Sequence, residues 1–101
     1  MSNSLSNASF KHNSEEQQYE LHLDDQIAVI EYLEQDGKID LVHTEVPKEL
    51  GGRGVGTELV KRTLEALQKN NASIKASCPF VAKYIDQHPE YASMLSTGYQ
   101  M

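Results

Sequence analysis

The sequence predicts a mixed α/β fold in which three antiparallel strands are followed by a helix, a parallel strand and a second helix. Three observations predict it. Residues 19–46 contain stretches in which apolar and polar side chains alternate, as in strands with one buried face. Residues 55–70 repeat apolar side chains with the period of an amphipathic helix. A short strand-like stretch follows at residues 72–77, and a strand reached through a helix is expected to run parallel to the strand before it.

The composition is that of a globular protein. The chain has 101 residues, of which 39% are hydrophobic and 24% charged, and its net charge is −6. These values are typical of one small soluble domain, and the negative charge argues against a nucleic-acid partner. No apolar stretch is long enough to span a membrane, and no signal peptide opens the chain. The single cysteine excludes an internal disulfide, which favours a reducing, cytoplasmic location.

The first fourteen residues differ in composition from the rest of the chain. Serine and asparagine fill eight of these positions, and the apolar Leu5 and Phe10 are isolated. Such a stretch buries too little apolar surface to offset the entropy lost on folding. We therefore expect a flexible polar tail at residues 1–14 and a single domain at residues 15–101.

Charge is distributed unevenly along the chain. Residues 15–49 contain eleven acidic and two basic side chains, whereas residues 51–83 contain six basic and two acidic ones. The second region therefore suits a polyanionic ligand, and the first can attract a cationic amine. The alternative is that these charges form an ordinary solvated surface.

The three antiparallel strands are expected at residues 19–23, 27–34 and 39–46. The second of them is apolar on both sides, which is typical of a central strand. Asp36-Gly37 lies between the second and third strands and is a strong signal for a type I′ hairpin turn. Pro47 ends the third strand because proline cannot donate a ladder hydrogen bond.

The third strand carries polar side chains whose direction follows from alternation. Alternation places His43 and Glu45 on the side of the apolar Leu41. Thr44 then faces the opposite way. His43 therefore has two interpretations: a core histidine whose ring is satisfied by a backbone carbonyl, or a general base at a cleft.

A glycine-rich turn precedes the predicted helix. Four of the six glycines lie within six positions, at Gly51, Gly52, Gly54 and Gly56. The first turn of a helix has N–H groups without partners and a positive dipole end, and glycines allow an anion to approach those groups. Arg53 adds a charged donor. The turn is interpreted as a phosphate- or pyrophosphate-binding loop; the alternative is a turn that only packs the strand against the helix.

Two common phosphate-binding motifs do not fit this turn. A P-loop ends in Gly-Lys-Ser/Thr, and no lysine follows the glycines. The dinucleotide-binding motif G-x-G-x-x-G requires a glycine where Thr57 stands, and an acid about twenty residues further on, where Lys75 and Ala76 stand. A different phosphate-binding loop is therefore needed.

The first helix is expected to end at Asn70-Asn71. Its apolar face has six residues at helical spacing: Val55, Leu59, Val60, Thr63, Leu64 and Leu67. Pro79 fits the first position of the second helix, so Cys78 is its N-cap, and Pro89 ends it. The side chains of the second helix that share a face are Phe80, Tyr84, Ile85 and His88. Residues after Tyr91 are expected to be irregular.

The glycine-rich turn resembles the pyrophosphate-binding loop of the GNAT superfamily of N-acetyltransferases, whose pattern is Q/R-x-x-G-x-G/A. Gly54 and Gly56 fill the last two places, and Gly51 stands where the pattern has Gln or Arg. Arg53 is placed to replace that side chain.

The wider sequence resembles one branch of this superfamily, the minimal single-domain GNAT-like proteins. The resemblance is carried by HTEVP at residues 43–47, CPF at residues 78–80 and HPEY at residues 88–91, in this order around the glycines. It covers about residues 19–95.

The resemblance implies a truncated GNAT-like acyl-CoA N-acyltransferase fold that holds acetyl-CoA in the gap where the third and fourth strands separate. The pyrophosphate of coenzyme A would lie on the glycine-rich turn, and the pantetheine arm would pair with the backbone near residues 44–46. The implied cofactor-binding residues are Thr44, Val46, Gly51, Gly52, Arg53, Gly54, Val55, Gly56 and Thr57.

Three side chains are candidates for catalysis. Cys78 matches the suspected catalytic cysteine of this branch, and a helix N-terminus favours a thiolate; the alternative is an inert, buried cysteine. His43 is a candidate base for an amine or for Cys78. Glu45 is the other candidate base, because many GNAT enzymes use a glutamate on this strand. Tyr84 can protonate a leaving thiolate or serve in packing. No spacing of His, Cys and acidic residues predicts a metal site.

The function that these features predict is an N-acetyltransferase that moves acetyl from acetyl-CoA to an amine, with the acceptor a protein or peptide in an open cleft. The alternative is a non-enzymatic module or sensor that binds coenzyme A or acetyl-CoA. The third hypothesis is a small α/β domain that binds no ligand.

Overall fold

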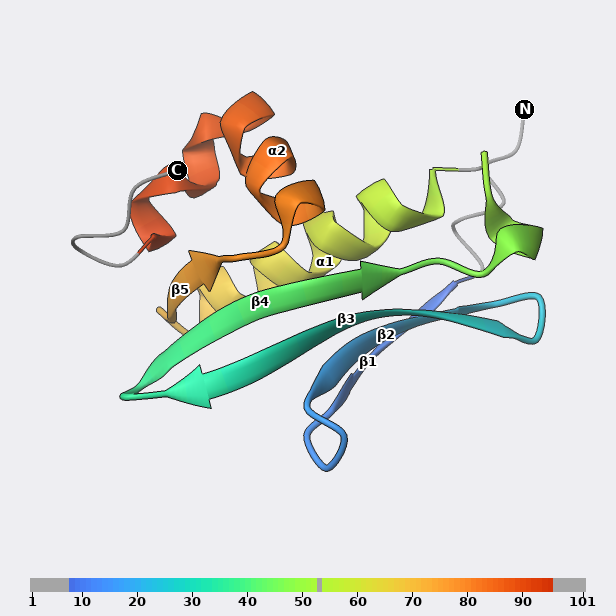
Figure 1. Cartoon of the computed structure of the whole chain (residues 1–101), viewed down its shortest axis with the longest axis horizontal. Coiled ribbons are helices and arrows are strands. Elements are labelled where there is room, and N and C mark those ends of the chain that lie inside the picture. The colour runs from blue at the N-terminus through green and yellow to red at the C-terminus, as the bar shows by residue number, and fades with distance from the viewer. Residues whose placement is uncertain (1–7, 53, 96–101) are drawn as a thin grey trace.

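The computed structural model describes residues 8–52 and 54–95. One five-stranded sheet, ordered β1-β2-β3-β4-β5, carries α1 and α2 on a single face (Figure 1). The strands are β1 (Ser9–Asn13), β2 (Gln18–Leu23), β3 (Gln26–Gln35), β4 (Lys38–Glu45) and β5 (Ser73–Ala76). The helices are α1 (Val55–Lys69), α2 (Pro79–Gln87) and two 3₁₀ helices at Lys48–Leu50 and Pro89–Met94. The mixed α/β fold class is confirmed.

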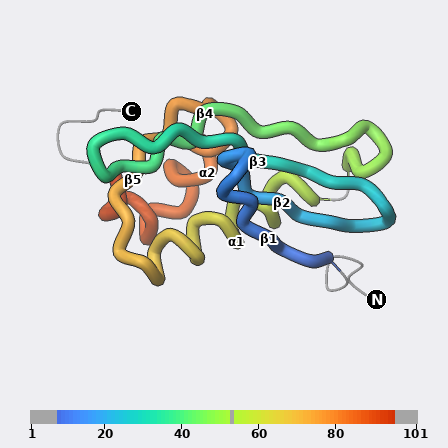
Figure 2. The backbone as a smooth tube through the Cα atoms, turned by 90° about the horizontal axis from the view of Figure 1, so that it is seen from below, coloured from blue at the N-terminus to red at the C-terminus, as the bar shows by residue number. Residues whose placement is uncertain are grey.

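Strand directions follow the predicted pattern. Strand β1 pairs with β2, β2 with β3 and β3 with β4, each time antiparallel, and the succession of strands across the sheet can be followed in Figure 2. The β3–β4 hairpin turns at Asp36 and Gly37, whose φ angles are 52° and 77°. A type I′ turn requires positive φ at both positions. Strand β5, reached through α1, is parallel to β4, with Ile39 paired to Ile74.

The prediction of a flexible tail at residues 1–14 is wrong for Ser9–Asn13, which form β1 and pair with β2. The physical reason lies in cross-strand contacts. The ring of Phe10 stacks on Tyr19 at 5.8 Å between centroids, and the ring of His12 stacks on the same tyrosine at 4.4 Å. The aromatic side chains that are isolated in the sequence thus find a partner on the neighbouring strand. Residues 1–7 lie outside the described part of the chain.

The core lies between the sheet and the two helices. All six residues of the predicted apolar face of α1 are buried. They pack toward Leu21, Ile30 and Leu41, which project from β2, β3 and β4 and are fully buried. The opposite face of the sheet, called here the helix-free face, carries none of the described helices (Figure 1). Ile27 and Leu33 are exposed on it.

Strand β4 contains a β-bulge that changes which side chains face the helices. Tyr32 pairs with Leu41, but its neighbour Glu31 pairs with His43, so Val42 is an extra residue without a cross-strand partner. An extra residue reverses the alternation beyond it. Thr44 consequently lies opposite the buried Ile30, on the helix-covered face.

The prediction that His43 and Glu45 share a face with Leu41 is therefore wrong. Both side chains are exposed, and the partner of His43 across the sheet is the exposed Glu31. Alternation holds only for a regular strand, and the bulge lies between Leu41 and His43. The interpretation of His43 as a core histidine is wrong for the same reason.

Helix α2 begins as predicted, with Cys78 at the N-cap and Pro79 at the first helical position. Its buried face differs from the prediction: Val81, Tyr84 and Ile85 are buried, whereas Phe80 is 43% exposed. Residues 92–94 are also more regular than expected. They belong to the 3₁₀ helix at Pro89–Met94, after which Leu95 forms a parallel bridge to Ile74 of β5.

None of the described helices combines the length and the apolarity that a bilayer-spanning helix requires.

Candidate active site

The pairing between β4 and β5 stops before β4 ends. Its last paired residues are Leu41 and Ala76, and the N–H of Cys78 then donates to the carbonyl of Leu41 at 2.8 Å. Beyond this point β5 gives way to α2, while β4 continues to Glu45. No described strand pairs with this last part of β4 on the β5 side. This unpaired edge of β4 beyond Leu41, together with the space that separates it from the start of α2, is called here the strand gap. An extended ligand can pair with such an edge.

The glycine-rich turn connects the 3₁₀ helix at Lys48–Leu50, which follows β4, to α1. Its glycines serve different purposes. Gly52 and Gly54 have φ angles of 79° and 75°, in the left-handed region that other residues rarely adopt. A Cβ atom at Gly56 would lie 3.1 Å from the ring of Phe80 and 3.3 Å from a methyl group of Val46. Gly56 thus lies in close packing between α1, α2 and the end of β4, where a larger side chain would require Phe80 or Val46 to shift. Arg53 lies outside the described residues.

The N-terminus of α1 has no side-chain cap. Gly54 occupies the N-cap position and has no side chain that can accept the first N–H groups of the helix. The N–H groups of Val55, Gly56 and Thr57 have no acceptor within the helix, and the helix dipole makes this end positive. Since the side chain of Val55 is buried, that residue offers only its backbone. This end of α1 is suited to bind an anion.

The strand gap contains a contact between a hydroxyl and the thiol. Thr44 Oγ1 lies 3.4 Å from Cys78 Sγ. The cysteine is only 5% exposed and is the N-cap of α2. The bulge at Val42 turns Thr44 toward this side of the sheet. The contribution of the Thr44 side chain was missed from the sequence, where regular alternation put it on the other face.

His43 and Glu45 form a second pair, on the helix-free face. His43 Nε2 lies 3.6 Å from Glu45 Oε1, and the two side chains are 55% and 70% exposed. The backbone of β4 separates this pair from Thr44 and Cys78, which lie on the helix-covered side. The three candidate catalytic residues thus lie on or beside the last part of β4, but not on one face of the sheet.

Tyr84 has the environment of a packing residue. Its ring is buried and stacks on the ring of His88 at 4.0 Å. Burial raises the pKa of the Tyr84 phenol above its usual value, and the nearby Tyr91 and Glu90 raise it further. His88 Nδ1 donates to the carbonyl of Tyr84 at 2.9 Å.

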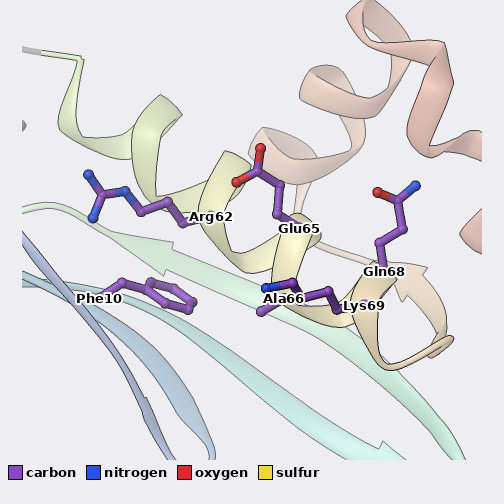
Figure 3. A pocket seen from close by; sticks show the side chains of 6 residues that line it. All are labelled: Phe10, Arg62, Glu65, Ala66, Gln68 and Lys69. Carbon is purple, nitrogen blue, oxygen red and sulfur yellow. The ribbon is translucent and has the colours of Figure 1, made fainter.

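Two cavities lie beside α1. One of about 270 Å³ lies between α1 and α2, next to the glycine-rich turn; its lining residues are Thr57, Phe80, Lys83, Tyr84, Gln87 and His88. The other, of about 510 Å³, lies between β1 and α1 (Figure 3). Figure 3 shows Phe10 of β1 facing the side chains of Arg62, Ala66 and Lys69 on α1. None of the candidate catalytic or cofactor-binding residues lines this larger cavity.

A buried carboxylate on the helix-free face also escaped prediction. Glu20 of β2 is 8% exposed and accepts hydrogen bonds from Asn13, Gln18 and His22, at 3.0, 2.7 and 2.7 Å. These hydrogen bonds, that from Gln18 first, lower the pKa of Glu20 to about 2. Among the described residues, no three His, Cys, Asp or Glu side chains gather into a candidate metal site.

Comparisons with known proteins agree with this architecture. The solution structure of a GCN5-like protein from Staphylococcus aureus is similar to that of this chain, with a TM-score of 0.65. The two sequences are 31% identical, and the match covers 95% of this chain and 91% of the other. Protein NATD1 of mouse is 29% identical over 85 residues, which are 78% of this chain and 74% of the mouse protein. Protein NATD1 of human is 33% identical over 51 residues, which are 50% of this chain and 45% of the human protein.

The family comparison covers the site together with strands β2 to β5. The model of the GCN5-related N-acetyltransferase family matches residues 18–94. That range includes β4, the glycine-rich turn, the thiol of Cys78 and the whole of α2. The chain therefore belongs to the GCN5-related N-acetyltransferase family.

Proposed function

We propose that this protein binds acetyl-CoA and transfers its acetyl group to an amine. The observation that carries the proposal is that two features lie close together: the edge of β4 that β5 leaves free, and the uncapped N-terminus of α1, where Gly56 packs against Val46 just beyond that edge. An extended arm can pair with the first while its diphosphate binds to the second. Acetyl-CoA has both parts.

The cofactor is expected to contact mainly backbone. Its pyrophosphate accepts hydrogen bonds from the N–H groups of Gly54 to Thr57, with Gly51, Gly52 and Arg53 contributing to the same turn. Its pantetheine arm pairs with Thr44 and Val46 in the manner of an added strand. The thioester is then held in the strand gap, beside Cys78.

The chemistry requires a base, because an ammonium ion is not a nucleophile. Glu45 or His43 accepts the proton of the amine, directly or through water. The amine nitrogen then attacks the thioester carbon, the N–C bond forms, and the C–S bond to coenzyme A breaks. The N–H of Val46 stabilises the negative charge that develops on the carbonyl oxygen, and the coenzyme A sulfur takes up a proton. In a second route the acetyl group passes through Cys78.

The acceptor is expected to approach from the helix-free face, where His43 and Glu45 are accessible. The helices leave this face uncovered (Figure 1), so its shape does not limit the acceptor to a small molecule. A protein or peptide amine fits such an open face. A reducing cytoplasm suits the free thiol of Cys78.

The test measures binding and transfer separately. Acetyl-CoA is added to the protein and the amide signals of residues 54–57 are followed by NMR; shifts at these amides are expected. Mass spectrometry then follows acetylation of a panel of amines and lysine-containing peptides. Binding without shifts at the glycine-rich turn would contradict the proposed cofactor site.

A non-enzymatic module or sensor for coenzyme A is the second candidate function. The specific observation in its favour is the exposure of both candidate bases, since His43 and Glu45 lie open to water, and general bases act best in a site from which water is excluded. Tight binding of coenzyme A together with no acetylation of any amine would favour this function.

A further inference from the structure

We propose that the hydroxyl of Thr44 holds the thiol of Cys78 in the strand gap and donates a hydrogen bond to its sulfur when that sulfur acts as a nucleophile. Thr44 is thus a positioning residue for the thiol. The inference rests on the proposed function for its use in acetyl transfer, but the contact itself is independent of any cofactor.

The first support is the local backbone. Thr44 reaches the thiol because Val42 is an extra residue in β4, which turns the following side chains over. Without this bulge, Thr44 would lie on the helix-free face, away from Cys78. A bulge leaves one residue out of the ladder, and bulges frequently re-aim a side chain beside an active site.

The second support is the way in which Cys78 is held. Its N–H donates to the carbonyl of Leu41 at 2.8 Å, and its carbonyl accepts from the N–H of Ala82 at 3.0 Å. The backbone is therefore fixed on both sides, by β4 and by α2. For the side chain, the contact with Thr44 Oγ1 at 3.4 Å is the hydrogen bond that sets the position of the sulfur.

The chemistry gives the hydrogen bond a direction. A neutral thiol can donate or accept, but a thiolate can only accept, so the Thr44 hydroxyl must donate to the nucleophilic form. In the thiol-dependent route, Cys78 Sγ attacks the acetyl carbon, the Sγ–C bond forms and the bond from carbon to the coenzyme A sulfur breaks. The proton released by Cys78 is balanced by the proton that coenzyme A takes up.

The test uses the 101-residue chain, in which Cys78 is the single cysteine. The rate of alkylation by iodoacetamide is measured without acetyl-CoA as a function of pH. Thr44→Val keeps the shape of the side chain and removes the hydroxyl; it is expected to slow alkylation at neutral pH about tenfold and to move the rate profile to higher pH. Thr44→Ser restores the hydroxyl and is expected to restore most of the rate.

The matched control is Thr63→Val on α1. Thr63 is fully buried, whereas Thr44 is partly buried. Thr63 Oγ1 has no hydrogen-bond partner among the described residues, so the same substitution there touches nothing near the sulfur. Its alkylation profile is expected to equal that of the wild type. An unchanged or faster rate in Thr44→Val, or a failure of Thr44→Ser to restore the rate, would overturn the proposal.

A second measurement separates this inference from the proposed function. Acetylation of Cys78 by acetyl-CoA is followed by mass spectrometry in the same variants, and Thr44→Val is expected to reduce its rate by a similar factor. If no acetyl-CoA binds while alkylation still depends on the hydroxyl, the proposed function fails and the role of Thr44 stands. If acetyl-CoA binds and neither rate depends on Thr44, the role of Thr44 fails alone.

Discussion

At the scale of single residues, Glu20 is a charged side chain whose surroundings tie its ionisation to stability. It is almost fully buried and accepts three side-chain hydrogen bonds. Such bonds to an ionised group stabilise a fold more than those between neutral groups. The carboxylate therefore contributes to folding as long as it is ionised in the native state.

The pH dependence follows from the pKa of this group. Hydrogen bonds from Gln18, His22 and Asn13 lower the pKa of Glu20 from 4.5 to about 2, so its contribution is complete above the unfolded value and is lost as the pH falls through the window between these two values. We expect Glu20→Gln to lower the free energy of unfolding at neutral pH by about 1–3 kcal/mol. Urea unfolding at several pH values measures the free energy of unfolding of the wild type and of the variant. The gap between wild type and variant is expected to close in acid; a constant gap would contradict the assignment.

The thiol and the two candidate bases illustrate what the sequence can reveal about single residues. The place of Cys78 at a helix start was predictable, because proline is favoured at the first position of a helix and Pro79 occupies that position in α2. The face of the sheet on which the His43 side chain lies was not predictable, because it depends on one extra residue, Val42, earlier in the strand. Val42 is an ordinary strand residue, so a bulge there leaves no local signal.

At the scale of elements, α1 was predicted almost completely and β1 was missed. The apolar face of α1 repeats with the helical period over many residues, and every member of it is buried. Strand β1 has no such internal pattern, and its stability comes from contacts with β2. Local sequence therefore defines the first element, while only tertiary pairing defines the second.

This difference predicts the effect of substitutions in β1. Phe10 packs on Tyr19 and is partly buried, whereas Lys11, the next residue, is exposed. We expect Phe10→Ala to lower the free energy of unfolding by about 1–3 kcal/mol, and Lys11→Ala to change it by less than about 0.5 kcal/mol. Thermal or urea denaturation provides the comparison. Equal effects of the two substitutions would mean that β1 does not belong to the folded domain.

The glycine-rich turn allows a matched test of cofactor binding. Gly54 and Gly37 both have φ angles in the left-handed region, 75° and 77°, and neither has a neighbour within 4 Å of an added Cβ. Alanine therefore introduces similar backbone strain at both positions, about 1–2 kcal/mol. Only Gly54 lies at the N-terminus of α1.

We expect Gly54→Ala to weaken acetyl-CoA binding at least about tenfold, because the new methyl group and the altered turn obstruct the approach of the pyrophosphate. Gly37→Ala, in the distant β3–β4 hairpin, is expected to leave the Kd unchanged. Isothermal titration calorimetry measures both. Equal affinity in the two variants would exclude this turn as the pyrophosphate site.

At the scale of the whole molecule, the sheet separates two surfaces with different chemical properties. The helix-covered side holds the uncapped end of α1 and the thiol, and the helix-free face holds His43, Glu45 and Glu31. A cofactor bound on one side leaves the other for the acceptor. The overall arrangement was predictable from the order of the elements, but this division was not, because it depends on the bulge in β4.

Charge on the helix-free face is expected to influence the acceptor. An amine acceptor is a cation at neutral pH, and Glu31 lies directly across the sheet from His43. We expect Glu31→Lys to raise the KM for a lysine-containing peptide about twofold to fivefold at low salt, with a smaller effect at high salt. The KM for acetyl-CoA serves as the internal reference and is expected to stay the same.

The control for this prediction lies on the other surface. Glu65 is exposed on α1, so Glu65→Lys changes the net charge by the same amount without altering the helix-free face. Its KM for the peptide is expected to equal that of the wild type. Equal increases for both substitutions would mean that net charge alone, and not this face, attracts the acceptor.

The tight contact between Gly56 and Phe80 has a consequence for how the sequence can diverge. A Cβ atom at position 56 and the aromatic ring at position 80 compete for the same few ångströms, since they would approach to 3.1 Å. Related chains that replace this glycine are therefore expected to carry a smaller side chain at position 80. An alignment of such chains would reveal the two positions as a co-varying pair, and independent variation would show that the ring can move aside without cost.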